Sequence, residues 1–286
     1  MESKIKKTLS LMRIKHYIKN LLIFFPVVFG GKLLNANVII MLIFGMLSFC
    51  LVASAVYIFN DIEDVEKDRL HPVKCKRPIA SGDISIWFAY MLFVICVLMS
   101  SVLAYYLAGF ELMGIILLYL LLNILYSKAL KNVPIIDIMI LASGFVLRVF
   151  FGGVLTNTEI SYWMFLVVLS GSLFMGLGKR RNELVKIKSN NTREVLKFYN
   201  YAFLDKYMYV CVTLIVVFYA LWTVDVQNKI MLFTVPILMA VMMKYSINIE
   251  DAESDGDPIE VILKDKVLIL LLVIYGLVSL FSLYVI

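Results

Sequence analysis

The chain has 286 residues, of which 62% are hydrophobic, and its mean hydropathy is +0.91. A composition this apolar excludes an ordinary water-soluble protein and indicates an integral membrane protein. The net charge of +6 bears on membrane orientation and anionic ligands rather than on nucleic acid, for which we expect no role. Because apolar sequence fills nearly the whole length, we expect a single transmembrane domain over residues 1–286.

Apolar segments recur along the whole chain. Most approach the roughly 20 residues that a helix needs to cross a bilayer, so the sequence predicts an all-α bundle of nine transmembrane helices. The first segment is the shortest and is interrupted by Pro26 and by Gly30-Gly31. The nine segments cover residues 20–31, 38–58, 87–108, 111–126, 134–155, 162–178, 207–224, 229–246 and 266–286.

Lysine and arginine residues predict how this bundle is oriented. With the N-terminus in the cytoplasm, every Lys and Arg except Lys32, Arg148 and Lys229 falls in a segment on the cytoplasmic side. This distribution follows the positive-inside rule. We therefore expect a multi-pass protein of the cell (inner) membrane, whose polar chemistry lies on the cytoplasmic face.

An acidic stretch, residues 60–69, directly follows the second apolar segment. If the helix continues through it, Asn60, Asp64 and Asp68 lie at i, i+4 and i+8 on one face, with Asp61 beside them. Mg²⁺ takes hard oxygen ligands, usually one or two carboxylates together with water and substrate phosphates. We therefore expect Asp61, Asp64 and Asp68 to bind Mg²⁺ and to be catalytic. The alternative is a solvated acidic loop between two membrane helices.

Arg148 lies inside an apolar segment, where a charge is costly and by default marks a functional site. Gly144, Gly152 and Gly153 flank it and allow neighbouring groups to approach closely. Asp137, at the start of the same segment, is a candidate partner for Arg148 or a helix cap. The alternative is that Arg148 extends to the membrane interface.

Several further cations are expected to bind phosphates on the cytoplasmic side. Lys15 and Lys19 are four residues apart, on one face if their segment is α-helical. Lys179 and Arg180 follow glycines at the end of an apolar segment and suit a polyphosphate, although the positive-inside rule alone explains either residue. The complete predicted substrate-binding set is Asn60, Lys15, Lys19, Arg77, Lys128, Arg148, Lys179 and Arg180.

A second acidic segment covers residues 248–266. It lacks sustained helical spacing, and Gly256-Asp257-Pro258 is typical of a turn. We expect a solvated loop here, for which a lid is the candidate role, and metal binding is the alternative.

Several of these motifs resemble one superfamily of membrane enzymes. Asn60-Asp61-x-x-Asp64-x-x-x-Asp68 resembles the NDxxDxxxD motif of the UbiA superfamily of intramembrane prenyltransferases, and the resemblance implies nine helices with a cytoplasmic Mg²⁺-diphosphate site. More of the chain resembles the decaprenyl-phosphate phosphoribosyltransferase branch. The stretches that carry this finer resemblance are Arg13-x-x-x-Tyr17-x-Lys19-Asn20, Asp64-x-Glu66-x-Asp68-Arg69-x-His71-Pro72, Lys76-Arg77-Pro78-Ile79-Ala80-Ser81-Gly82, Gly144-Phe145-Val146-Leu147-Arg148 with Gly152-Gly153, and Leu177-Gly178-Lys179-Arg180-Arg181-x-Glu183-Leu184.

The resemblance implies an activity and its substrates. In that branch 5-phosphoribose passes from phosphoribosyl diphosphate to a polyprenyl phosphate, and diphosphate is released. Residues 179–183 stand where many superfamily members carry a second aspartate-rich motif, which counts against an aromatic prenyltransferase. Ile14 and Tyr17 replace an expected proline and tryptophan, which leaves the lipid length and the donor open. The alternatives are prenyl transfer to an aromatic or glycerol-phosphate acceptor, and transport of an anionic lipid.

Overall fold

The computed structural model describes residues 2–185, 194–250 and 258–285, and every regular element among them is a helix. Within these residues, seven helices are long and apolar enough to cross a membrane, as expected of a multi-pass membrane protein. The predicted all-α class is therefore confirmed. The count of nine spans and the cytoplasmic N-terminus remain predictions.

The chain divides into two compact units. Unit 1 consists of Met1–Val27, Lys32–Lys131 and Leu147–Thr158, and unit 2 consists of Val28–Gly31, Asn132–Val146 and Glu159–Ile286. The elements of unit 1 are α1 (Glu2–Leu11), η1 (Ile14–Phe24), the start of α2 (Phe25–Phe29), α3 (Ala36–Glu63), α4 (Val65–Arg69), η2 (Lys74–Lys76), α5 (Ile86–Lys128) and the second part of α6 (Ile136–Leu155). Each η element is a 3₁₀ helix.

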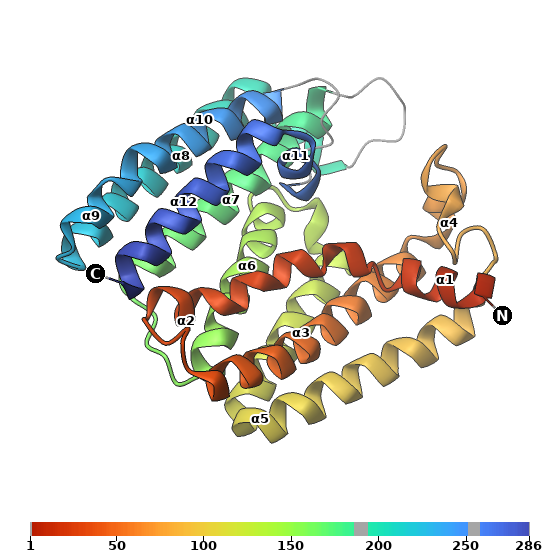
Figure 1. Cartoon of the computed structure of the whole chain (residues 1–286). Coiled ribbons are helices and arrows are strands. Elements are labelled where there is room, and N and C mark those ends of the chain that lie inside the picture. The colour runs from red at the N-terminus through yellow and green to blue at the C-terminus, as the bar shows by residue number, and fades with distance from the viewer. Residues whose placement is uncertain (1, 186–193, 251–257, 286) are drawn as a thin grey trace. The chain divides into compact units, whose positions relative to one another are not determined.

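Helices α3 and α5 run side by side and form the framework of unit 1 (Figure 1). Helix α3 begins where the Asn35 side chain accepts hydrogen bonds from two backbone N–H groups of the first turn. Helix α5 has 43 residues, and its straight length would be roughly 65 Å, about twice the hydrocarbon thickness of a bilayer. It breaks at Ala108 and Gly109, where Gly109 has a φ of 69°. This break lies at the connection predicted between segments 87–108 and 111–126.

The first apolar segment differs most from the prediction. It begins as a 3₁₀ helix, η1, and continues into the short α2. In a 3₁₀ helix residues four apart point about 120° away from each other, so Lys15 and Lys19 do not share a face. Lys15 is exposed and Lys19 is half-buried. Helix η1 lies directly on α6, because a Cβ at Gly152 would overlap the backbone carbonyl of Ile23.

Unit 2 packs around α7 and α8, which lie against each other. Its core includes Leu177, Met208, Ile249 and Leu268. Its elements are the first part of α6, α7 (Tyr162–Val185), η4 (Glu194–Phe198), α8 (Tyr201–Asp225), α9 (Lys229–Leu232), α10 (Thr234–Glu250), α11 (Pro258–Lys264) and α12 (Lys266–Tyr284).

The segment expected to be an acidic loop, residues 248–266, contains the short helix α11. The proline at its start fits the first position of a helix, where no N–H partner is needed. Of the predicted turn Gly256-Asp257-Pro258, the first two residues lie outside the described part of the chain.

Candidate active site

The acidic motif lies across a helix junction in unit 1. Helix α3 ends at Glu63, and Asp64, with φ −96° and ψ 7°, connects it to α4. The backbone N–H groups of Asp64 and Asp68 still reach the carbonyls of Asn60 and Asp64, at 3.0 and 2.8 Å. Helical spacing is therefore nearly kept across the junction, while the side chains divide into two pairs.

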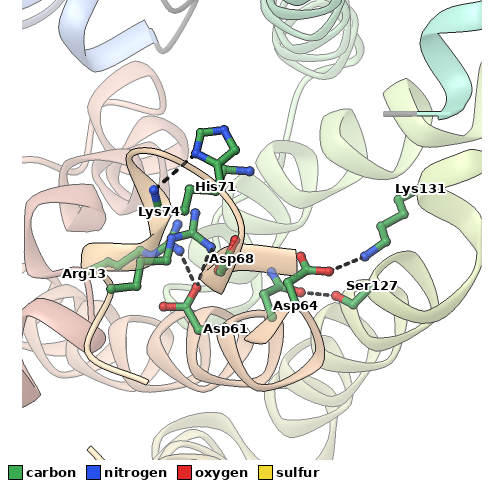
Figure 2. A network of polar contacts seen from close by, with 10 residues as sticks. Arg13, Asp61, Asp64, Asp68, His71, Lys74, Ser127 and Lys131 are labelled. Carbon is green, nitrogen blue, oxygen red and sulfur yellow. Dashed lines mark hydrogen bonds and ion pairs between the residues drawn. The ribbon is translucent and has the colours of Figure 1, made fainter. Parts of the chain in front are cut away.

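The first pair is Asp61 and Asp68, which are seven residues apart, or about two turns, on one side. Each residue is only 3% exposed. Nη1 of Arg77 lies 3.2 Å from Oδ1 of Asp61 and 2.5 Å from Oδ2 of Asp68, and Nη2 of Arg13 lies 2.6 Å from Oδ1 of Asp61 (Figure 2). Two buried carboxylates thus converge on one guanidinium.

The second pair is Asn60 and Asp64, which are four residues apart. Nζ of Lys131 lies 2.8 Å from Oδ1 of Asp64, and the Ser127 hydroxyl donates to Oδ1 of Asn60 (Figure 2). Asn60 and Asp64 thus contact residues at and just after the end of α5. Asp68 instead shares the Arg77 guanidinium with Asp61.

The donor set can be compared with the needs of Mg²⁺. Among the described residues, no three His, Cys, Asp or Glu side chains form a group that could hold a metal ion. However, Asp61 and Asp68 already converge on one cation, and Mg²⁺ usually takes only one or two protein carboxylates beside water and phosphate oxygens. These two residues fit that requirement, whereas Asp64 faces Lys131.

Arg148 is 6% exposed and lies inside unit 1. Its Nε donates to Oδ1 of Asn20 at 2.7 Å, and its Nη2 donates to the Tyr119 hydroxyl at 3.3 Å. The guanidinium carbon also lies 4.9 Å from the ring centroid of Phe49 and 5.2 Å from that of Tyr119. Arg148 therefore links η1, α3, α5 and α6, and its side chain is buried among them rather than extended at the protein surface.

Asp137, a candidate partner of Arg148 or a helix cap by its position in the sequence, pairs with Arg180 in unit 2. Nε of Arg180 lies 2.5 Å from Oδ2 of Asp137, its Nη1 lies 2.7 Å from Oε2 of Glu183, and the Arg180 side chain is 0% exposed. The Tyr199 hydroxyl donates to Oδ1 of Asp137 at 2.6 Å. Burial, with the Asp137 carboxylate, raises the pKa of the Tyr199 hydroxyl, so Tyr199 stays a donor. Two carboxylates and complete burial favour a structural role for Arg180 over the predicted phosphate contact.

The other predicted cations differ in their surroundings. Lys128, at the end of α5, is exposed, and its ammonium lies 5.9 Å from the ring centroid of Phe59. Lys15 is exposed on η1, and Lys19 is half-buried there. Lys179 is half-buried on α7 in unit 2.

Sequence reasoning missed three residues that contact the motif. Arg13 begins the stretch Arg13-x-x-x-Tyr17-x-Lys19-Asn20 but is not in the predicted binding set, and Ser127 and Lys131 lie just after a predicted span, with no further signal in the sequence. Only folding brings the end of α5 to the end of α3. Contacts between residues 67 positions apart are not visible in a spacing pattern.

The sequence and the fold of the chain are similar to those of known proteins. The UbiA prenyltransferase family model matches residues 23–264. The decaprenyl-phosphate phosphoribosyltransferase of Corynebacterium glutamicum is 34% identical over 269 residues, covering 90% of this chain and 80% of that protein. The enzyme of the same name from Mycolicibacterium smegmatis is 34% identical over 276 residues, covering 90% and 86%. A UbiA homolog from Archaeoglobus fulgidus, solved bound to GPP and Mg²⁺, superposes with a TM-score of 0.73 over 96% of this chain and 99% of that one; at 18% identity this likeness shows the fold alone.

Proposed function

The chain belongs to the UbiA prenyltransferase family, and from that premise we propose that it transfers 5-phosphoribose from phosphoribosyl diphosphate to a polyprenyl phosphate. The names of relatives that are 34% identical over 90% of the chain support this choice of donor and acceptor. The observation that carries the proposal is the convergence of Asp61 and Asp68 on Arg77, with Arg13 beside them. Paired acids and guanidinium groups suit a metal-bound diphosphate.

The proposed reaction is a displacement at the anomeric carbon of the ribose. An oxygen of the lipid phosphate forms the new C–O bond, and the bond to diphosphate breaks with its electron pair leaving on the diphosphate. Arg13 and Arg77 bind and orient the diphosphate and neutralise the charge that develops on it. A phosphate monoester is already a competent nucleophile, so this chain need not supply a general base.

Mg²⁺ is the proposed cofactor, and Asp61, Asp64 and Asp68 are the carboxylates proposed to hold it. When bound, Mg²⁺ supplies charge neutralisation that makes diphosphate a better leaving group. Asp61 and Asp68 are supported by their convergence on one cation. Asp64 is the weaker member of the set, since it pairs with Lys131.

The remaining predicted contacts stay part of the proposal, with different support. Lys128 and Lys19 lie in unit 1, which also contains the acidic motif, and are proposed to contact phosphates. The pairing of Arg148 with Asn20 favours a supporting role for that arginine. The other proposed phosphate or donor contacts are Asn60, Lys15 and Lys179. For Arg180 the proposed phosphate contact is the alternative to the structural role that its two carboxylate partners favour.

The proposal also includes where the reaction occurs. The distribution of lysine and arginine supports a cytoplasmic N-terminus, nine spans and an active site on the cytoplasmic side of the inner membrane. The lipid tail would then lie among apolar helices, while its phosphate meets the acidic motif.

The test is transfer of label from radiolabelled phosphoribosyl diphosphate into lipid by the purified full-length protein, with polyprenyl phosphate as acceptor. We expect label in the lipid extract and an equal amount of released diphosphate. Asp61→Asn and chelation by EDTA should each abolish both products, whereas Asp225→Asn, at an exposed position on α8, should leave them unchanged. Transfer from a prenyl diphosphate, with no transfer from phosphoribosyl diphosphate, would overturn the proposal in favour of prenyl transfer.

A further inference from the structure

Arg77 lies in the connection between α4 and α5, and the chain before Arg77 is held in place differently from the chain after it. After Arg77, Pro78 and Ile79 are buried, and Ile79 packs in an apolar cluster with residues of α1 and α3. Before it, none of residues 70–76 is buried, and Leu70 and Val73 are 81% and 69% exposed. Apolar packing therefore does not hold the segment that leads into Arg77, and hydrogen bonds must order it.

The imidazole of His71 makes such bonds. Its Nδ1 accepts the backbone N–H group of Val73 at 3.1 Å. The same atom accepts the backbone N–H group of Lys74 at 3.3 Å (Figure 2). The carbonyl of Lys74 in turn accepts the N–H of Arg77 at 2.9 Å, and the carbonyl of His71 accepts the N–H of Cys75 at 3.1 Å. A short series of hydrogen bonds thus connects the ring to the backbone of Arg77.

We propose that His71 is a positioning residue for Arg77: by accepting two backbone N–H groups, it holds the turn that places Arg77 between Asp61 and Asp68. This inference rests on the proposed function, since Arg77 matters to the reaction through that site. A ring nitrogen that accepts two N–H groups carries no proton, so the ring proton lies on Nε2. His71 acts here through Nδ1 and through the backbone, and it touches neither substrate nor the reacting atoms.

The alternative is that Nε2 of His71 donates to a substrate phosphate. Two substitutions separate these roles, because Asn places an oxygen near the position of Nδ1 whereas Gln places its amide near the position of Nε2. Asn is also well suited to accept backbone N–H groups one to three residues further along the chain. His71→Asn should therefore preserve the turn, and His71→Gln and His71→Ala should lose it.

The experiment measures initial rates of the purified full-length variants with phosphoribosyl diphosphate as the varied substrate. We expect KM for this donor to rise about tenfold in His71→Ala and His71→Gln, because two backbone hydrogen bonds are lost, and to stay within about twofold of wild type in His71→Asn. Thermal unfolding of each variant checks that the fold is kept. The opposite ranking, with Gln active and Asn impaired, would assign the role to Nε2 and overturn the inference. Equal kinetics in all variants, or equal loss in all three, would overturn it too.

A double-mutant cycle tests whether His71 acts through Arg77. If it does, adding His71→Ala to Arg77→Ala should change KM by less than about twofold beyond Arg77→Ala alone. Independent, multiplying effects would contradict the inference. A wild-type protein that is inactive with phosphoribosyl diphosphate but active with a prenyl diphosphate refutes the proposed function only, and the same series is then measured with that donor.

Discussion

Removing the Asp137 carboxylate should destabilise unit 2, because the buried guanidinium of Arg180 would lose its closest partner. Both side chains are 0% exposed, and breaking such a buried pair costs about 3–5 kcal/mol. Arg180 keeps Glu183 at 2.7 Å, so we expect the lower end, about 3 kcal/mol. Tyr199 also loses its acceptor, which adds about 1 kcal/mol.

The assay is thermal unfolding of the purified full-length protein. For a chain of this length, 1 kcal/mol shifts Tm by about 2–4 °C, so Asp137→Ala should lower Tm by about 8–16 °C. The matched control is Asp225→Ala on α8, where the aspartate is exposed. A surface change of that kind should alter stability by no more than about 0.5 kcal/mol.

A double variant separates structure from phosphate binding. Asp137→Leu with Arg180→Met removes both charges and replaces them with apolar groups, which should recover most of the lost Tm. Recovered Tm with an unchanged donor KM would support a purely structural role for Arg180, whereas recovered Tm with weakened donor binding would show that Arg180 contacts phosphate. If the Tm of Asp137→Ala equals that of the Asp225→Ala control, the buried Asp137–Arg180 pair does not contribute the stability expected of it.

Three further predictions follow from the geometry. Asp68→Asn should lower kcat/KM by about 100-fold, because Asp68 converges with Asp61 on Arg77. Asp64→Asn should lower it by only about tenfold, because Asp64 pairs with Lys131 instead. Equal losses of kcat/KM in a radiolabel assay would contradict this difference. Gly152→Ala should lower stability by about 1–3 kcal/mol, because its Cβ would overlap a backbone carbonyl of η1, whereas Gly114→Ala on α5 has open space around it and should raise Tm slightly or leave it unchanged. The pKa of Asp265 is lowered to about 2, first by its hydrogen bond from a lysine of α10 and then by N–H groups of α12. The ionised Asp265 therefore contributes fully to folding stability above about pH 4, and this contribution is lost as pH falls toward 2. The Tm difference between wild type and Asp265→Asn should therefore shrink over that interval, and a constant difference would rule out this linkage.

The spanning helices could be predicted because length and hydropathy alone decide whether a helix can cross a membrane. Seven described helices fulfil that criterion, and the break in α5 lies at the connection predicted between segments 87–108 and 111–126. The first segment could not be predicted as well. Helix η1 is 3₁₀ rather than α, and its close approach to Gly152 depends on a partner far along the chain.

The candidate site was predicted in its residue types but not in its pairing. Local spacing placed Asn60, Asp64 and Asp68 on one helix face. It also made Asp137 a candidate partner of Arg148, because both residues lie in the same apolar segment. In the structure Asp68 joins Asp61 at Arg77. Arg148 binds Asn20, which is 128 positions away. Such choices depend on which side chains the packed helices bring within reach.

The sequence by itself determined that this is a helical membrane protein, with basic residues concentrated between its apolar segments and an acidic motif at the end of one segment, because composition, hydropathy and residue spacing are properties of the chain alone. Tertiary structure decided which cation each carboxylate meets. An ion pair forms only where two charged groups lie a few ångströms apart, and that distance is set here by helix packing between segments remote in the chain.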